Sequence, residues 1–248
     1  MKRFQVVGIG NAMVDVLARA QEGFLAEAGV EKGIMQLIDM ERAVDLYSRV
    51  GPAKEVSGGS AANTIAGIAQ LGGRTAYVGK VKDDQLGAIF AHDLRAQGAD
   101  YETTLAPKTA EDETGRCIVI VTPDGERSLN TYLGISTNLG PNDVPDEVAN
   151  NAAIMFLEGY LFDKDAGKEA FLQASRVTRE AGGMAGIAIS DPFCVNRHRA
   201  DFLRMIGDEL DFVMGNEAEV KSLFETDDLE AALAKTAAMC PLVVCTRS

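Results

Sequence analysis

Short apolar runs alternate with amphipathic segments along most of the chain. The runs have the length and composition of strands that are buried on both faces, and we expect them at residues 4–8, 33–38, 75–81, 153–157, 186–189, 212–214 and 242–245. Helical periodicity lies between them, at residues 40–50, 61–71, 84–97, 164–181, 197–209, 217–224 and 228–239. This alternation predicts an α/β fold, with a central, mostly parallel sheet and helices on both faces.

One stretch departs from the alternation. Residues 114–121 and 126–132 are strand-like and flank Thr122-Pro123-Asp124-Gly125, which suits a tight turn between antiparallel strands. Together with the extended segments 14–18 and 54–56, this hairpin predicts a small second sheet that acts as a lid. We therefore expect one α/β domain over residues 1–248, with lid strands drawn from these segments.

Composition excludes several classes of protein. The 24 Lys and Arg residues against 37 Asp and Glu residues give a net charge of −13, which argues against a nucleic-acid partner. No run of about 18 apolar residues is present to span a bilayer, and the N-terminal apolar run is too short for a signal peptide. We expect a cytoplasmic protein without a membrane partner.

Cysteine and histidine usage restricts the metal chemistry. The four cysteines are scattered without a C-x-x-C pair, so we expect reduced residues in the core. Only two histidines are present, and neither belongs to a zinc motif. A metal, if bound, is expected to have oxygen ligands.

The first candidate motif is a glycine turn after the first apolar run, with Gly8 and Gly10 followed by Asn11 and Asp15. A dinucleotide fingerprint requires a third glycine where Met13 stands and a helix next, whereas the following residues favour an extended chain. A carboxylate such as Asp15 can accept hydrogen bonds from two neighbouring hydroxyls. An ordinary turn with a solvated aspartate remains the alternative.

The second motif is Ser57-Gly58-Gly59-Ser60-Ala61-Ala62-Asn63, which opens a helix of small residues. Glycines let a ligand approach the backbone, the helix start offers free N–H groups, and Asn63 adds a donor and an acceptor. These features suit a polyol, while the Gly-Lys-Ser/Thr ending of a P-loop is missing. Close packing of the helix on its sheet explains the small residues equally well.

Two further segments complete an ordered set. Val78-Gly79-Lys80-Val81-Lys82-Asp83-Asp84-Gln85-Leu86-Gly87 follows the second motif, and Gly215-Asn216-Glu217-Ala218-Glu219 lies near the end of the chain. By the order and spacing of all four, the chain resembles the ribokinase-like (PfkB) family of carbohydrate and nucleoside kinases over essentially its whole length.

The resemblance implies a site with two parts. Asp15 would bind sugar hydroxyls, and the sugar site would be completed by Asn11, Gly59, Ser60 and Asn63. The family's N-x-x-E pattern would place Asn216 and Glu219 near the phosphates of ATP and their Mg²⁺, with Glu219 acting through water, and Thr246 would begin the nucleotide-binding loop. A favourable charge in the first turn of a helix is the alternative role of Glu219.

The lid segment around Arg127 resembles that of adenosine kinases, whose arginine reaches the transferred phosphate. The resemblance thus implies transfer of the γ-phosphoryl group of ATP to a primary hydroxyl, with adenosine preferred and ribose or fructose as competitors. A solvated hairpin arginine is the alternative for Arg127. A monovalent cation, and a monomer or homodimer, are compatible with this family.

The family's Gly-Ala-Gly-Asp stretch, whose aspartate is the general base, does not occur in these 248 residues. We expect its place to lie beyond Ser248, so that the chain as given would be truncated and would not turn over. A non-catalytic module that binds a sugar or nucleoside, and a nicotinamide-dependent oxidoreductase built on the first glycine turn, are the alternatives from other classes.

Overall fold

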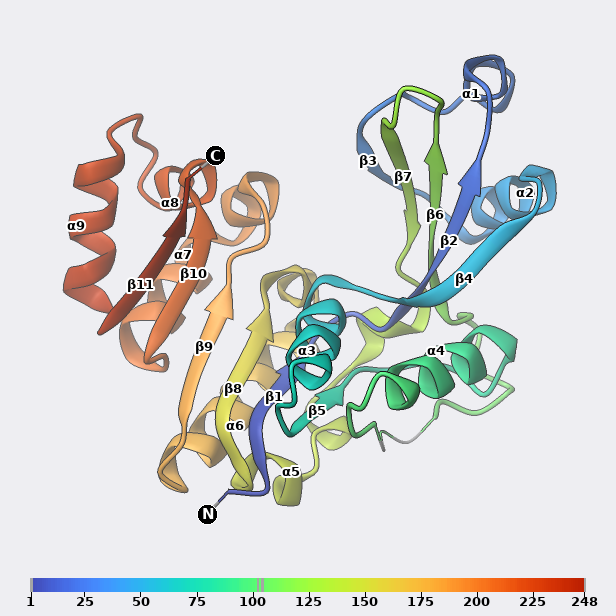
Figure 1. Cartoon of the computed structure of the whole chain (residues 1–248). Helices are drawn as coiled ribbons and strands as arrows, with labels where there is room; N and C mark the ends of the chain where they lie inside the picture. The colour runs from blue at the N-terminus through green and yellow to red at the C-terminus, as the bar shows by residue number, and fades with distance from the viewer. Residues whose placement is uncertain (1, 102, 104, 248) are drawn as a thin grey trace.

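The computed structural model describes residues 2–101, 103 and 105–247, which form two sheets with helices around them (Figure 1). The larger sheet has six strands, all parallel, in the order β11-β10-β9-β8-β1-β5. These strands are β1 (Phe4–Ile9), β5 (Thr75–Val78), β8 (Ala152–Glu158), β9 (Met184–Ala188), β10 (Phe212–Asn216) and β11 (Leu242–Thr246). The order reverses between β1 and β8, the position at which open α/β sheets form ligand crevices.

Helices cover both faces of this sheet, as the alternating pattern predicted. One face packs on α3 (Ser60–Gln70), with α4 (Gln85–Ala96) beside it (Figure 1). The other face packs on α5 (Asp146–Asn150), α6 (Asp165–Glu180), α7 (Pro192–Asp208), α8 (Glu217–Leu223) and α9 (Leu229–Met239). Short 3₁₀ helices η1 (Gly134–Asn138), η2 (Pro141–Asp143) and η3 (Gly159–Asp163) link these elements.

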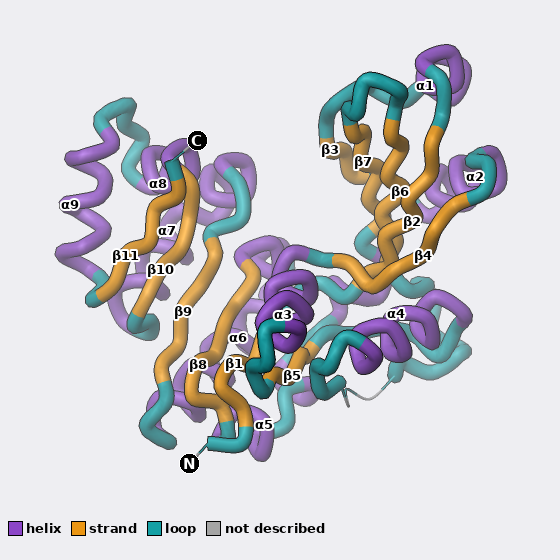
Figure 2. Tube along the Cα trace, in the orientation of Figure 1, coloured by secondary structure: helices purple, strands orange, loops and turns teal. Residues whose placement is uncertain are grey.

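The second sheet has five strands of mixed direction in the order β3-β7-β6-β2-β4. They are β2 (Met13–Arg19), β3 (Met35–Leu37), β4 (Ala53–Gly58), β6 (Gly115–Val121) and β7 (Arg127–Tyr132), and the helices α1 (Glu22–Ala28) and α2 (Met40–Arg49) lie against it. The sheet stands beyond the carboxyl end of β1 (Figure 2). Its hairpin turn has a backbone hydrogen bond from Gly125 to Thr122, with Gly125 at a φ of 89°. The prediction of a hairpin and a second sheet is confirmed.

The glycine turn after β1 leads into strand β2, and no helix follows it. A dinucleotide fingerprint needs a helix whose N-terminus faces the pyrophosphate. The oxidoreductase hypothesis is therefore wrong.

One core strand was placed in the wrong sheet. Residues 33–38 were expected in the central sheet, but β3 is an edge strand of the second sheet and pairs in parallel with β7. Met35 and Leu37 are 45% and 56% exposed, so this apolar run does not belong to the core.

Helix boundaries also differ in detail from the pattern. The helix that was expected from residue 197 begins at Pro192, capped by the Asp191 side chain, and is interrupted by the non-helical backbone of His198. Asp39 caps α2 as its side-chain chemistry favours. Within the described part of the chain, none of the helices is long and apolar enough to cross a membrane.

Candidate active site

A pocket of about 430 Å³ lies between the carboxyl ends of β1 and β8 and the inner face of the second sheet. All of the residues expected to hold a polyol line it, and so does Arg127. Its wall is formed by Asn11, Met13, Asp15, Met35, Leu37, Gly59, Ser60, Asn63, Cys117, Arg127, Leu129, Thr131, Leu133, Glu158, Tyr160, Asp163, Asp191, Phe193 and Arg197. The structure thus brings together motifs that are far apart in the sequence.

The chain between β4 and α3 requires glycine at two positions. Gly59 has a φ of 101°, and a β-carbon there would overlap the carbonyl oxygen of Asn11. A β-carbon at Gly58 would overlap the carboxylate of Asp15. These glycines let the start of α3 approach the end of β1 and leave room for Asp15 beside the backbone.

Glu158, at the end of β8, organises the floor of the pocket although the sequence analysis did not single it out. Its Oε1 accepts hydrogen bonds from the backbone N–H and the Nδ2 of Asn11, each at 3.1 Å. Its Oε2 accepts from Ser60 Oγ and from the Ala61 N–H, each at 2.8 Å. Burial raises the pKa of Glu158, and the hydrogen bonds oppose that rise by stabilising the charged form.

This network engages two of the predicted ligand-binding side chains. Asn11 is 1% exposed, and its Oδ1 also accepts from Ser136 Oγ at 3.0 Å. Ser60 donates its only hydroxyl hydrogen to Glu158. The side chains of Asn11 and Ser60 therefore hold the wall of the pocket in place.

Three polar side chains in the pocket keep their hydrogen-bonding capacity. Within the described residues, Asp15, Asn63 and Arg127 make no side-chain hydrogen bond or ion pair, and all three line the cavity. Burial raises the pKa of Asp15 to about 6, and the positive charge of Arg127 partly offsets that rise. A carboxylate, an amide and a guanidinium are thus available to a ligand.

The rest of the wall is largely apolar. The second sheet supplies Met13, Met35, Leu37, Cys117 and Leu129, and Leu133 follows it. Phe193, in the first turn of α7, lines the pocket from the side of the larger sheet and is 76% exposed. The pocket therefore combines a few free polar groups with extensive apolar surface, which is typical of sites for small organic ligands.

The second group of predicted residues meets at the other side of the sheet's carboxyl edge. Asn216 and Thr246 are register partners at the ends of β10 and β11. Asn216 caps α8 by accepting from the Glu219 N–H at 2.9 Å, and Glu219 accepts from the Asn216 N–H at 2.8 Å in return. Glu219 thus lies in the first turn of a helix, as the alternative interpretation predicted, and it also closes a capping box, which that interpretation did not include.

These residues do not form a magnesium site by themselves. Both carboxylate oxygens of Glu219 already accept hydrogen bonds from Asn216, and Glu219 is 8% exposed. Among residues 2–101, 103 and 105–247, no three His, Cys, Asp or Glu side chains are grouped to hold a metal ion. A role for Glu219 through water stays a prediction.

The capping box predicts the effect of one substitution. Asn216→Ala removes the acceptor for the Glu219 N–H and leaves a helix N-terminus uncapped, so we expect the free energy of unfolding to fall by about 1 kcal/mol. Urea denaturation of the chain without nucleotide measures this loss. Asn216→Ser, which can restore a cap, should recover most of the stability, and an unchanged midpoint for Asn216→Ala would contradict the capping role.

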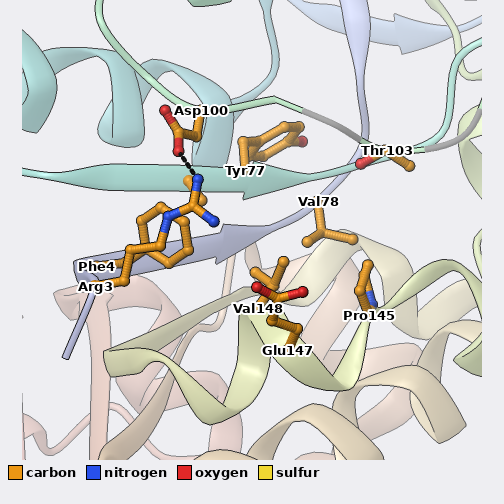
Figure 3. Close-up of a pocket in the computed structure, with 10 residues that line it drawn as sticks. Arg3, Phe4, Tyr77, Val78, Asp100, Thr103, Pro145, Glu147 and Val148 are labelled. Atoms are coloured by element: carbon orange, nitrogen blue, oxygen red, sulfur yellow. Dashed lines mark hydrogen bonds and ion pairs between the residues drawn. The ribbon is translucent and has the colours of Figure 1, made fainter.

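A smaller cavity of about 130 Å³ lies against the start of β1 and strand β5 (Figure 3). Three charged side chains line it: Arg3 and Asp100 pair with each other at 2.8 Å, and Glu147 is exposed. The cavity is small, and it lacks a largely buried, unpaired carboxylate such as that of Asp15. It is a weaker candidate than the pocket at the carboxyl edge.

Comparison with known proteins agrees with this fold. The model of the "pfkB family carbohydrate kinase" family matches residues 32–248. The structure of a "probable sugar kinase protein from Rhizobium etli CFN 42" superposes with a TM-score of 0.89 at 48% identity, over 99% of this chain and 74% of that chain. The "adenosine kinase from Sinorhizobium meliloti" superposes with a TM-score of 0.89 at 47% identity, over 98% of this chain and 74% of that chain.

Curated sequences are more distant. "Probable fructokinase-2" of Arabidopsis thaliana is 26% identical over 199 residues, which are 74% of this chain and 60% of that protein. "Fructokinase-1" of Zea mays is 28% identical over 70% of this chain and 54% of its own length. The chain thus spans less than two thirds of the length of these relatives.

Proposed function

The chain belongs to the pfkB family of carbohydrate kinases, and on that premise we propose that its pocket holds a nucleoside or sugar whose primary hydroxyl receives the γ-phosphoryl group of ATP. Adenosine is the acceptor that we favour. The observation that carries this choice is the composition of the pocket, in which three free polar side chains face a wall of apolar ones.

The two parts of the pocket suit the two parts of a nucleoside. Asp15 can accept hydrogen bonds from neighbouring ribose hydroxyls, and Asn63 can both donate and accept. Apolar side chains such as Leu37, Leu129 and Phe193 can pack on the faces of a flat base, which free ribose or fructose lacks. A hexose would leave this apolar surface in contact with water.

The proposed transfer assigns distinct roles to the described residues. Asp15 and Asn63 orient the acceptor, and Arg127 stabilises negative charge on the transferred group. The second sheet, which carries Arg127, covers the acceptor and excludes water that would otherwise hydrolyse ATP. Asn216, Glu219 and Thr246 lie at the same carboxyl edge of the sheet, where the phosphates of ATP would be bound.

Binding to the 248-residue chain tests the acceptor preference. Isothermal titration with adenosine, ribose and fructose should give the tightest binding for adenosine, by at least about fivefold, because base stacking adds about 1–3 kcal/mol. Inosine serves as a control for the base edge. Tighter binding of fructose or ribose than of adenosine would replace the nucleoside with a sugar as the acceptor.

Phosphoryl transfer is tested on the protein purified from its natural source. Its intact mass is measured first, and ATP consumption is then followed in a coupled assay with each acceptor. We expect consumption that depends on adenosine. Binding of adenosine by the natural protein without ATP consumption would support a binding module and would contradict the kinase proposal.

A further inference from the structure

The first turn of α7 differs from the rest of that helix. His198 has non-helical backbone angles, so residues 192–197 form a short helical segment that is set off from the longer one. Phe193 in this segment lines the pocket and is 76% exposed. A large aromatic side chain is thus exposed at the rim of the site, where a bound ligand could contact it.

Buried neighbouring residues anchor the segment that carries Phe193. Its next two residues, Cys194 and Val195, are completely buried in the core. Ser190, just before the segment, adopts a φ of 73°, and its carbonyl oxygen accepts from the hydroxyl of Tyr160 at 3.4 Å. An exposed ring on an anchored turn is preorganised to contact a ligand.

Asp163 holds the far end of the same segment. Its carboxylate accepts from Arg197 Nη2 at 3.1 and 3.2 Å and from Arg197 Nε at 3.2 Å. The Nε2 of His198, at the kink itself, lies 2.7 Å from Asp163 Oδ1. Asp163 therefore binds the two residues where the short segment meets the rest of α7.

Packing of its neighbour Phe162 fixes the position of Asp163. The preceding residue, Phe162, is 2% exposed and stacks on Phe202 of α7, with the ring centroids 4.2 Å apart and an angle of 3° between the planes. Phe162 also contacts the ring of Phe171 on α6, at 5.8 Å between centroids. The carboxylate is thus fixed to the longer part of α7 and reaches back to the kink.

The contacts of Asp163 argue against a direct role in binding the ligand, although it lines the pocket. Three of its four contacts with Arg197 and His198 are made by Oδ1, and Oδ2 accepts from Arg197 Nη2, so both carboxylate oxygens are engaged. Asp15, by contrast, has no hydrogen-bond partner within the described residues. Asp163 is therefore suited to position a neighbour.

We infer that Asp163 is a positioning residue for nucleoside recognition, which holds the ring of Phe193 over the acceptor pocket through Arg197 and His198. The inference rests on the proposed function, because it assigns to this contact the selection of an acceptor with an aromatic base. It predicts that loss of the carboxylate weakens binding of the base and leaves binding of the sugar unchanged.

Titration of variants tests this selectivity. Asp163→Ala should weaken binding of adenosine by about fivefold to tenfold and leave the dissociation constant of ribose within about twofold of the wild-type value. The matched control is Asp201→Asn, on α7, whose carboxylate pairs with Lys168 and whose side chain is as exposed as that of Asp163, at 29%. This control should change neither affinity. Equal losses for adenosine and ribose in Asp163→Ala would overturn the inference.

A double-mutant cycle separates positioning from direct contact. If Asp163 acts only through Phe193, Asp163→Ala has no further effect on adenosine affinity once Phe193→Ala is present. If the two losses multiply, Asp163 contributes independently and the inference is wrong. Thermal melting of each variant accompanies the cycle, and Asp163→Asn serves in place of Asp163→Ala if the latter fails to fold.

A fluorescent probe at position 193 reports the mobility of this side chain and distinguishes failure of this inference from failure of the proposed function. The chain has no tryptophan, so Phe193→Trp introduces a single fluorophore at the rim. Its steady-state anisotropy should fall when Asp163→Ala is added and should not change with Asp201→Asn. A fall without any adenosine binding would support the positioning role and contradict the nucleoside kinase, whereas unchanged anisotropy would overturn the positioning role itself.

Discussion

Asp15→Asn is expected to weaken acceptor binding by about 100-fold while making the protein more stable at neutral and alkaline pH. Asp15 lies largely buried in the pocket without a hydrogen-bond partner among the described residues, and burial raises its pKa to about 6. Ionisation of Asp15 therefore lowers the free energy of unfolding. Asparagine has nearly the same shape and removes that cost, but it cannot accept from two hydroxyls with a full negative charge.

The pH dependence of the gain follows from the direction of the pKa shift. Between about pH 4 and pH 6 the folded state holds a proton on Asp15 that the unfolded state has released, so this group makes the free energy of unfolding fall as the pH rises. Above about pH 6.5 the penalty is constant, at about 3 kcal/mol or less for a shift of this size. The stability difference between Asp15→Asn and the wild type should thus be near zero at pH 4 and largest at pH 7–8.

Urea denaturation at pH 4, 6 and 8 measures this difference, and titration with adenosine at pH 8 should show a loss of affinity of about 100-fold. The control is Asp227→Asn, an exposed carboxylate in a loop, which should alter neither quantity. A variant that is less stable than the wild type at pH 8 would show that the Asp15 carboxylate supports the fold and would contradict its assignment as a ligand-binding group.

Affinity of the wild type should follow the same titration. Below about pH 6 the carboxyl group of Asp15 is protonated and loses acceptor capacity, so binding of the acceptor should weaken as the pH falls through that value. Protonation of Asp15 at low pH therefore stabilises the folded state but weakens binding of the acceptor. Such a conflict is typical of side chains retained for function.

The fold could be predicted from the sequence where burial determines the pattern. The six strands of the central sheet are short apolar runs, and each was found within a few residues of its position. Helices cover both faces of β1, β5 and β8, whereas β11 at the edge is only partly buried. The run at residues 33–38 shows the limit of this signal. Met35 and Leu37 are apolar and line the pocket. A pattern of hydrophobicity cannot distinguish residues that line a ligand pocket from residues that are buried in the core.

The start of α7 was missed although local signals for it exist. Asp191-Pro192 offers a capping side chain and a proline at the first helical position. The kink at His198 interrupts the helical periodicity, so only the later part of the helix was recognised. Phe193, which lines the pocket from this turn, was missed as a site residue for the same reason. Arg197 also lines the pocket, but it lay inside the expected helix 197–209 and no motif marked it.

Glu158 could not be assigned from its local sequence because its partners come from other parts of the chain. It stands directly after an apolar strand, a position at the carboxyl edge of the sheet that favours a site residue. Its four hydrogen bonds run to Asn11, Ser60 and Ala61, which are about 100 to 150 residues away. Only the crossover of the parallel sheet brings these segments together.

Glu158→Gln should consequently lower the free energy of unfolding by about 2–4 kcal/mol at pH 8. One carboxylate oxygen becomes an NH₂ group, which then faces either the donors of Asn11 or those of Ser60 and Ala61 at the buried junction of β1 and α3. Glu169→Gln, an exposed change on α6, is the control and should have little effect. Urea denaturation gives the stability, and hydrogen exchange at the Asn11 and Ala61 amides should be faster in Glu158→Gln.

The pH dependence of the same variant identifies the charge state of Glu158. Burial raises the pKa of Glu158 on folding, although its four donors oppose that rise, so on acidification the folded state binds a proton that the unfolded state has released. Glutamine does not titrate, so the wild type should gain stability relative to Glu158→Gln and the difference should widen as the pH falls toward the ordinary range of a glutamate. A difference that narrows on acidification would mean that the four donors outweigh burial and lower the pKa of Glu158.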